Sequence, residues 1–156
     1  MKRRNGFTLI EIMIVVVIIG ILSALAIPRF TKASMRSKIS EARLILRSIY
    51  QAAMIYYQEN GCYPGTNWGT WFFNNAKTKN TSWNELPGFD LDRPSGYPRF
   101  TYSLWTWTDP TTKKSFFHAA RAWGWSPDSY DAQVRKVKDL QIDKDGIITG
   151  GTIMGE

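Results

Sequence analysis

The most unusual ionisable residue in the sequence is Glu11, which lies in a long apolar segment near the N-terminus. From Ile12 to Ile27 nearly every residue is Ile, Val, Leu, Met, Ala or Gly. A lone carboxylate at the centre of a membrane helix costs about 2.5–3.5 kcal/mol on insertion scales. Glu11 therefore needs a hydrogen-bond partner, a route to the membrane interface or a positive group.

Three interpretations account for Glu11. Thr8-Leu9-Ile10-Glu11 fits a capping box, in which the carboxylate turns back to the backbone N–H of Thr8. Glu11 also lies near one end of the apolar segment, from which it could reach the interface. In the third interpretation the chain is cut after Gly6, and Phe7 then carries a new ammonium group. A carboxylate one turn away on a neighbouring, axially shifted helix would neutralise that group, so both charges become inexpensive only on assembly.

The other candidate sites favour a structural protein over an enzyme. Asp143-Lys144-Asp145-Gly146 resembles the start of a calcium loop but lacks the distant glutamate. Asp-Gly between two apolar strands instead predicts a turn. We therefore expect no metal site, and Asp143 and Asp145 are retained as the alternative, with Asp128 and Asp131 as a second acidic corner.

The single histidine and the single cysteine also lack the partners that catalysis requires. His118 lies among aromatic residues, and no nucleophile or carboxylate pattern accompanies it. Cys62 has no partner for a disulfide or a metal site, and we expect a small buried side chain. The seven tryptophans are expected in the core, on the sheet or between subunits. Stacking with sugars or single-stranded DNA stays open, although no basic groove accompanies them. We expect no enzymatic activity and no cofactor.

The segment that carries Glu11 is long enough to cross a membrane. As a helix, Phe7 to Ile27 would extend about 32 Å. Secretory signal peptides have a shorter apolar region with a small-residue cleavage site after it, whereas Gly6 precedes this one. The cluster Lys2-Arg3-Arg4 should stay cytoplasmic, so the C-terminal part faces outward.

The apolar segment is expected to continue into an amphipathic helix that ends at Asn60. Gly20 and Pro28 should loosen or kink the helix. Asn60-Gly61 supplies a C-cap. After Pro28, apolar residues recur at spacings of four and three and form one stripe: Met35, Ile39, Ala42, Leu46, Ile49, Ala53 and Tyr56. Several charged residues lie off this stripe: Lys32, Arg36, Lys38, Glu41, Arg43 and Arg47. The stripe requires a sheet that covers it.

The strands of that sheet are expected late in the chain. Arg99 to Trp107 and Ser115 to Trp123 are rich in aromatic and β-branched residues, with a turn between them. Lys138 to Ile142 and Ile147 to Thr149 predict a second hairpin. The intervening residues 61–98 are predicted as a long loop with a short helix near Thr70 to Ala76 or Ser82 to Leu86. The fold class is therefore α+β, with a small antiparallel sheet packed on the C-terminal half of a long helix.

The N-terminal residues resemble those of type IV pilins and their relatives. The resemblance covers Lys2-Arg3-Arg4-Asn5-Gly6, then Phe7-Thr8-Leu9-Ile10-Glu11, and extends to Pro28 and Phe30. It implies that a prepilin peptidase removes residues 1–6, and that Phe7 becomes N-methylphenylalanine. Residues 7–30 would then be the membrane and filament-core helix, and residues 31–156 the head. The head would comprise a helix over 31–60, a loop over 61–98 and a sheet over 99–156.

The resemblance also implies partners and location. The chain would assemble with itself into a helical homopolymer through Glu11 and Thr8. An assembly platform would recruit it from the inner membrane, where it is a single-pass, N-in protein. The finished assembly would be an extracellular pilus for adhesion, motility or DNA uptake. The alternatives are a periplasmic type II secretion pseudopilus that drives protein export, and a minor pilin that binds DNA or a surface.

Overall fold

The computed structural model describes residues 6–64, 99–109, 111–112, 114–124, 131 and 133–154. Clustering of contacts divides the chain into two compact units, Met1–Arg36 and Ser37–Glu156. The expected boundary between the membrane helix and the head, after residue 30, stays a prediction. The short helix expected near Thr70 to Ala76 or Ser82 to Leu86 falls outside the described residues.

The α-helix of the described residues, α1, runs from Leu9 to Asn60. Its start lies two residues after the predicted one, because Thr8 caps it. Gly61 ends it as expected, with a φ of 70° that favours glycine and a backbone hydrogen bond of 2.8 Å to the Tyr57 carbonyl. Both Gly20 and Pro28 lie within the continuous helix.

The sheet has four antiparallel strands in the order β1-β2-β3-β4. Their bounds are Thr101–Thr108 for β1, Ser115–Trp123 for β2, Leu140–Ile142 for β3 and Ile148–Gly150 for β4. A 3-10 turn, η1, over Val134–Lys136 precedes β3 and was not predicted from the sequence. All four predicted strands are confirmed within two residues at each end. Consecutive strands pair throughout, so the described sheet contains no crossover.

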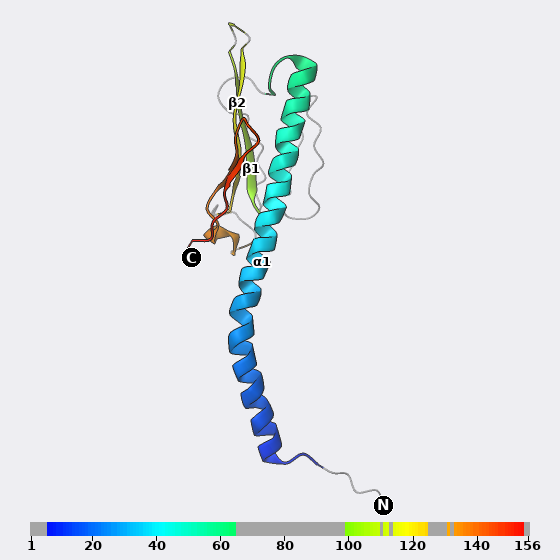
Figure 1. Ribbon diagram of the computed structural model, residues 1–156, viewed down its shortest axis with the longest axis vertical. Coiled ribbons are helices and arrows are strands. Elements are labelled where there is room, and N and C mark those ends of the chain that lie inside the picture. The colour runs from blue at the N-terminus through cyan, green and yellow to red at the C-terminus, as the bar shows by residue number, and fades with distance from the viewer. Residues whose placement is uncertain are drawn as a thin grey trace, which may run out of the picture. The chain divides into compact units, whose positions relative to one another are not determined.

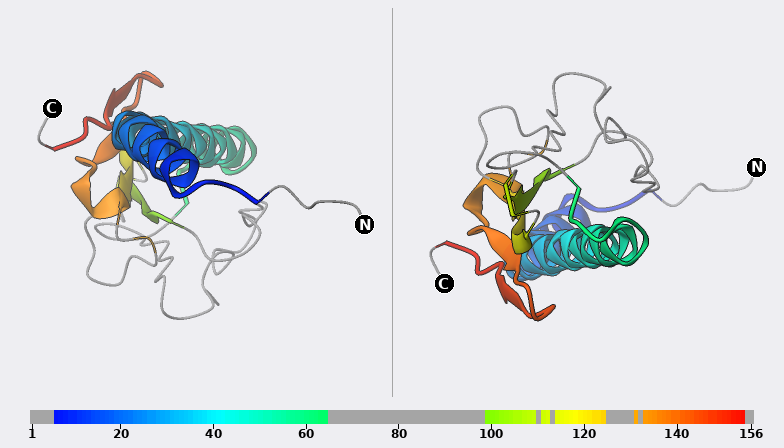
Figure 2. Two further views of the ribbon diagram at one scale, coloured as in Figure 1. Left: turned by 90° about the horizontal axis from the view of Figure 1, so that it is seen from below. Right: turned by 90° about the horizontal axis from the view of Figure 1, so that it is seen from above.

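The C-terminal half of α1 packs on one face of this sheet (Figures 1 and 2). Six of the seven predicted stripe residues are buried, and Tyr56 is half-buried. On β1 and β2, the cross-strand pairs Tyr102–Ala122 and Leu104–Ala120 are also buried. The helical period therefore identified the packed face correctly. Burial of a residue such as Leu46 contributes about 1.5–3 kcal/mol.

Small residues let the chain approach closely where the last hairpin meets the rest of the head. A Cβ added to Gly150 would lie 1.9 Å from the carbonyl oxygen of Asp139, and the φ of Gly150 is 84°. A Cβ on Gly151 would lie 3.2 Å from the Ile39 side chain. These two glycines therefore allow β4 and the following residues to lie against β3 and the helix.

Candidate functional site

The bond between Gly6 and Phe7 lies outside the helix. Gly6, Phe7 and Thr8 have no regular secondary structure, and Phe7 is 83% exposed. Nothing lies within 4 Å of a Cβ built on Gly6. The expected scissile bond is thus accessible in an unwound segment. Lys2, Arg3 and Arg4 lie outside the described residues.

Thr8 and Glu11 form the capping box that the sequence suggested. Oε2 of Glu11 accepts hydrogen bonds of 2.7 Å from both the backbone N–H and the hydroxyl of Thr8. The backbone N–H of Glu11 donates to the Thr8 hydroxyl oxygen at 3.4 Å. The box satisfies donors that the first turn of a helix otherwise leaves unpaired. These bonds use only one oxygen of the carboxylate, so Oε1 can still accept a donor.

The apolar segment has no packing partner among the residues that the structure describes. An 18-residue window of α1 has a mean hydropathy of 2.9, and none of it is buried. From Ile12 to Ile27 the large apolar residues are each at least half exposed, from 50% for Ile12 to 65% for Leu25. By length and composition the helix can cross a membrane. A surface this apolar needs lipid or other subunits around it.

The positions expected to weaken the helix lie in this exposed segment and just beyond it. Nothing lies within 4 Å of a Cβ built on Gly20. The Thr31 hydroxyl donates a hydrogen bond of 2.9 Å to the Pro28 carbonyl. The kink or loosening expected at Gly20 and Pro28 stays a prediction.

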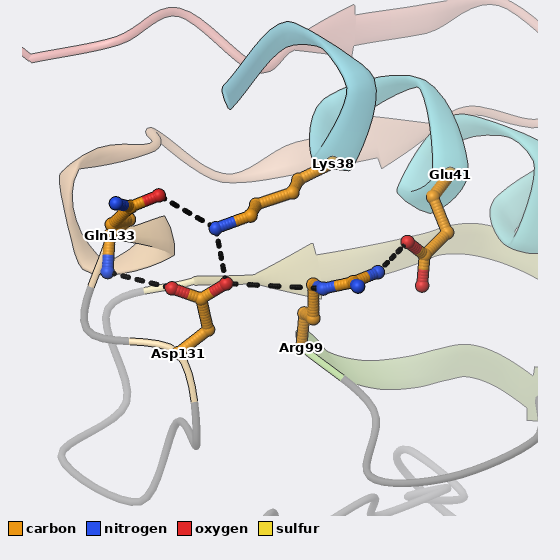
Figure 3. A network of polar contacts seen from close by, with 5 residues as sticks. All are labelled: Lys38, Glu41, Arg99, Asp131 and Gln133. Carbon is orange, nitrogen blue, oxygen red and sulfur yellow. Dashed lines mark hydrogen bonds and ion pairs between the residues drawn. The ribbon is translucent and has the colours of Figure 1, made fainter. Parts of the chain in front are cut away.

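A polar network joins the helix to the start of the sheet (Figure 3). Lys38 on α1 contacts Asp131 at 2.5 Å and donates a hydrogen bond of 2.7 Å to the Gln133 side chain. Arg99, just before β1, pairs with Glu41 on α1 and lies 3.9 Å from Asp131. The network therefore links three parts of the head that are far apart in the sequence.

Asp131 is the most enclosed acid of this network. Partial burial raises the pKa of Asp131, but other contacts outweigh it and hold that pKa below its ordinary value. They are the Lys38 hydrogen bond, the Gln133 backbone N–H, and the charges of Lys38 and Arg99. Asp131 thus stabilises the head in its ionised form. The second acidic corner that paired it with Asp128 is untested, because Asp128 lies outside the described residues.

Asp143 builds the turn of the second hairpin. Its Oδ1 accepts hydrogen bonds of 2.9 Å from the backbone N–H groups of Asp145 and Ile147. The Asp145 carboxylate contacts the Lys144 ammonium at 2.8 Å. Gly146 has a φ of 76°, as a turn of this kind requires. The described residues contain no group of three or more His, Cys, Asp or Glu side chains that could hold a metal.

The remaining candidates lie apart from one another. His118 is exposed at a register shift between β1 and β2, with its ring 6.1 Å from Trp105. Cys62 is half-buried rather than fully buried, since it follows the end of the helix. Of the tryptophans, the described Trp105, Trp107 and Trp123 are half-buried on strands.

The polar network and the turn before β3 were not predicted from the sequence. Lys38 and Glu41 were expected off the apolar stripe, and both are half-buried at its flanks. The pairs Lys38–Asp131 and Arg99–Glu41 could not be predicted, because their members lie far apart in the sequence. Val134 and Val137 are fully buried, and their spacing of three was the available signal.

Comparison with known proteins relates the N-terminal part of the chain to filament subunits. Residues 1–27 match the prokaryotic N-terminal methylation motif. The chain is 54% identical over 61 residues to a type IV major pilin of Myxococcus xanthus, covering 39% of this chain and 28% of that protein. It is 44% identical over 64 residues to a fimbrial protein of Neisseria meningitidis, covering 41% of this chain and 38% of the relative.

A secretion-system protein is similar to the same degree. Identity to a type II secretion system core protein G of Pseudomonas aeruginosa is 41% over 68 residues, covering 44% of this chain and 48% of that protein. The chain thus spans less than half the length of each of these relatives. Their names describe pilus and secretion-system proteins, which agrees with a non-enzymatic role. No solved structure matches significantly.

Proposed function

Because its N-terminal segment is that of the type IV pilin and type II secretion pseudopilin superfamily, we propose that this chain is a structural subunit of a type IV pilus. The observation that carries the proposal is the methylation motif over residues 1–27, together with an apolar helix that packs against no other described part of the chain. Assembly with copies of itself would cover that apolar surface.

Processing prepares the subunit for assembly. Cleavage between Gly6 and Phe7 removes the basic leader and creates an ammonium group at Phe7, which is then methylated. The exposed, non-helical position of Phe7 supports this step, because a peptidase needs an unwound bond. The inner-membrane peptidase and the assembly platform are the partners that such processing requires.

Glu11 serves two successive states of the subunit. Before assembly its Oε2 is held by Thr8, which lowers the cost of a carboxylate in lipid. During assembly Oε1 accepts a hydrogen bond from the Phe7 ammonium group of a neighbouring, axially shifted subunit. The capping box and the intermolecular pair are therefore compatible, since they can use different oxygens.

The Glu11→Ala variant tests this proposal in a strain that lacks the wild-type copy. The variant should insert and fold, because it removes a charge from lipid, yet filaments should be lost or greatly reduced. Glu59→Ala is the matched control, since it removes an exposed carboxylate from the last turn of the same helix. Electron microscopy counts the filaments. Normal filaments with Glu11→Ala would refute the charge-pair mechanism.

A pseudopilus subunit is the second candidate. The match to the secretion core protein G covers 48% of that protein, a larger share than for the two pilus proteins described above. Electron microscopy of the cell surface separates the two functions, because a pilus extends from the cell and a pseudopilus stays in the periplasm. A minor pilin with a DNA-binding or adhesive head would instead leave filament number nearly unchanged on deletion.

A further inference from the structure

Three cations follow the apolar segment on one side of α1. Arg29, Lys32 and Arg36 recur at spacings of three and four, which places them on one helix face, and all three are exposed. We call these three residues the basic row. From Ile12 to Ser40 the helix contains no Asp or Glu, so no acid lies within one turn of any member on α1. Lys32 and Arg36 also make contacts within the chain.

Helix geometry directs this row toward the membrane surface. At a rise of 1.5 Å per residue, Arg29 lies about 3 Å and Arg36 about 14 Å beyond Ile27 along the helix. Side chains of a helix tilt toward its N-terminus, which here is the direction of the apolar segment. Long basic side chains also extend their charged ends along apolar surface to reach the interface. All three charged groups therefore come within reach of the headgroup layer.

We propose that the basic row binds the anionic headgroups of phospholipids next to the outer end of the membrane helix. This binding holds the unassembled subunit at a fixed depth, and assembly has to break it. The inference rests on the proposed function in two respects, that α1 crosses a membrane and that the leader is removed. After the leader is removed, Lys2, Arg3 and Arg4 are gone, and the row is the basic cluster that remains beside the apolar segment.

Lipid selectivity in a reconstituted bilayer tests the proposal. The chain beginning at Phe7, without the basic residues Lys2, Arg3 and Arg4, is placed in phosphatidylcholine nanodiscs with either spin-labelled phosphatidylglycerol or spin-labelled phosphatidylcholine. Electron paramagnetic resonance then measures the fraction of each label immobilised by the protein. Wild type should prefer phosphatidylglycerol, and high salt should weaken that preference. Replacement of Arg29, Lys32 and Arg36 by Gln should lower the preference at least about fivefold, the effect expected from even one cation beside the membrane.

Two further variants make the outcome specific. Replacement of Arg43, Arg47 and Lys138 by Gln removes the same charge from exposed positions of the head and should leave the preference unchanged. The double variant Arg29→Lys/Arg36→Lys keeps the charge and should behave as wild type. The proposal would be overturned if the lipid preference were unchanged when the basic row is replaced by Gln, or if it fell equally when the three head residues are replaced. A loss of the preference in the Arg29→Lys/Arg36→Lys variant would also overturn it. Filaments are not needed for this measurement, so its failure is distinct from failure of the proposed function.

Discussion

Leu46 and Arg43 lie three residues apart on α1 but in opposite environments. Leu46 is fully buried against the sheet, whereas Arg43 is exposed. In a soluble head domain of residues 31–156, Leu46→Asp should unfold the protein, because an uncompensated carboxylate in the core costs several kcal/mol. Arg43→Asp should change the free energy of unfolding by about half a kcal/mol or less. Thermal melts measure the stability of both variants. If Leu46→Asp melts like the wild type, the assignment of the helix face that packs on the sheet is wrong.

Asp131 should make the head sensitive to acid. The folded-state pKa of Asp131 lies below the ordinary value of an aspartate, so its stabilisation is present above the unfolded pKa and is lost as pH falls through the folded value. Chemical unfolding at about pH 5 and pH 3 should therefore show a larger loss for wild type than for Asp131→Asn. Asp139→Asn, which removes an exposed acid, is the control. Equal losses in wild type and Asp131→Asn would show that the network does not depend on this charge.

At the scale of elements, the last hairpin depends on Gly150, whose position leaves no room for a side chain. Gly150→Ala would drive a Cβ into the Asp139 carbonyl at 1.9 Å, in addition to the strain of a positive φ. Gly61→Ala carries the strain of a φ of 70° but meets nothing within 4 Å. We therefore expect Gly61→Ala to cost about 1 kcal/mol and Gly150→Ala clearly more, as measured by urea unfolding. Similar costs for both would mean that β4 can move away from β3.

The helix and the strands could be predicted because their signals are local. Residues such as Ile39 and Leu46 recur with the helical period, and Phe117 lies in a run rich in aromatic residues. The pairs Lys38–Asp131 and Arg99–Glu41 join residues far apart in the sequence, and neither end carries a periodic signal. The capping box could be predicted for the same reason as the helix. Thr8 and Glu11 are one turn apart, a spacing that suggests the hydrogen bonds seen between them.

At the scale of the whole molecule, the head should fold without the membrane segment. Every stripe residue lies beyond Phe30. The four strands of the described sheet also all lie after residue 30 and form hydrogen bonds with one another. Expression of residues 31–156 should give a soluble protein with one helix and an antiparallel sheet. Circular dichroism and a cooperative thermal transition check this expectation. An aggregated or unfolded product would show that the membrane segment also supports the head.

The central claim is that the chain leaves the membrane as a processed filament subunit. Intact-protein mass spectrometry of filaments sheared from the cell surface tests it most directly. The chain should be present without residues 1–6 and with one added methyl group, because we propose that cleavage after Gly6 and methylation of Phe7 precede assembly. Filaments that lack the chain, or a chain in them that still begins at Met1, would contradict the claim.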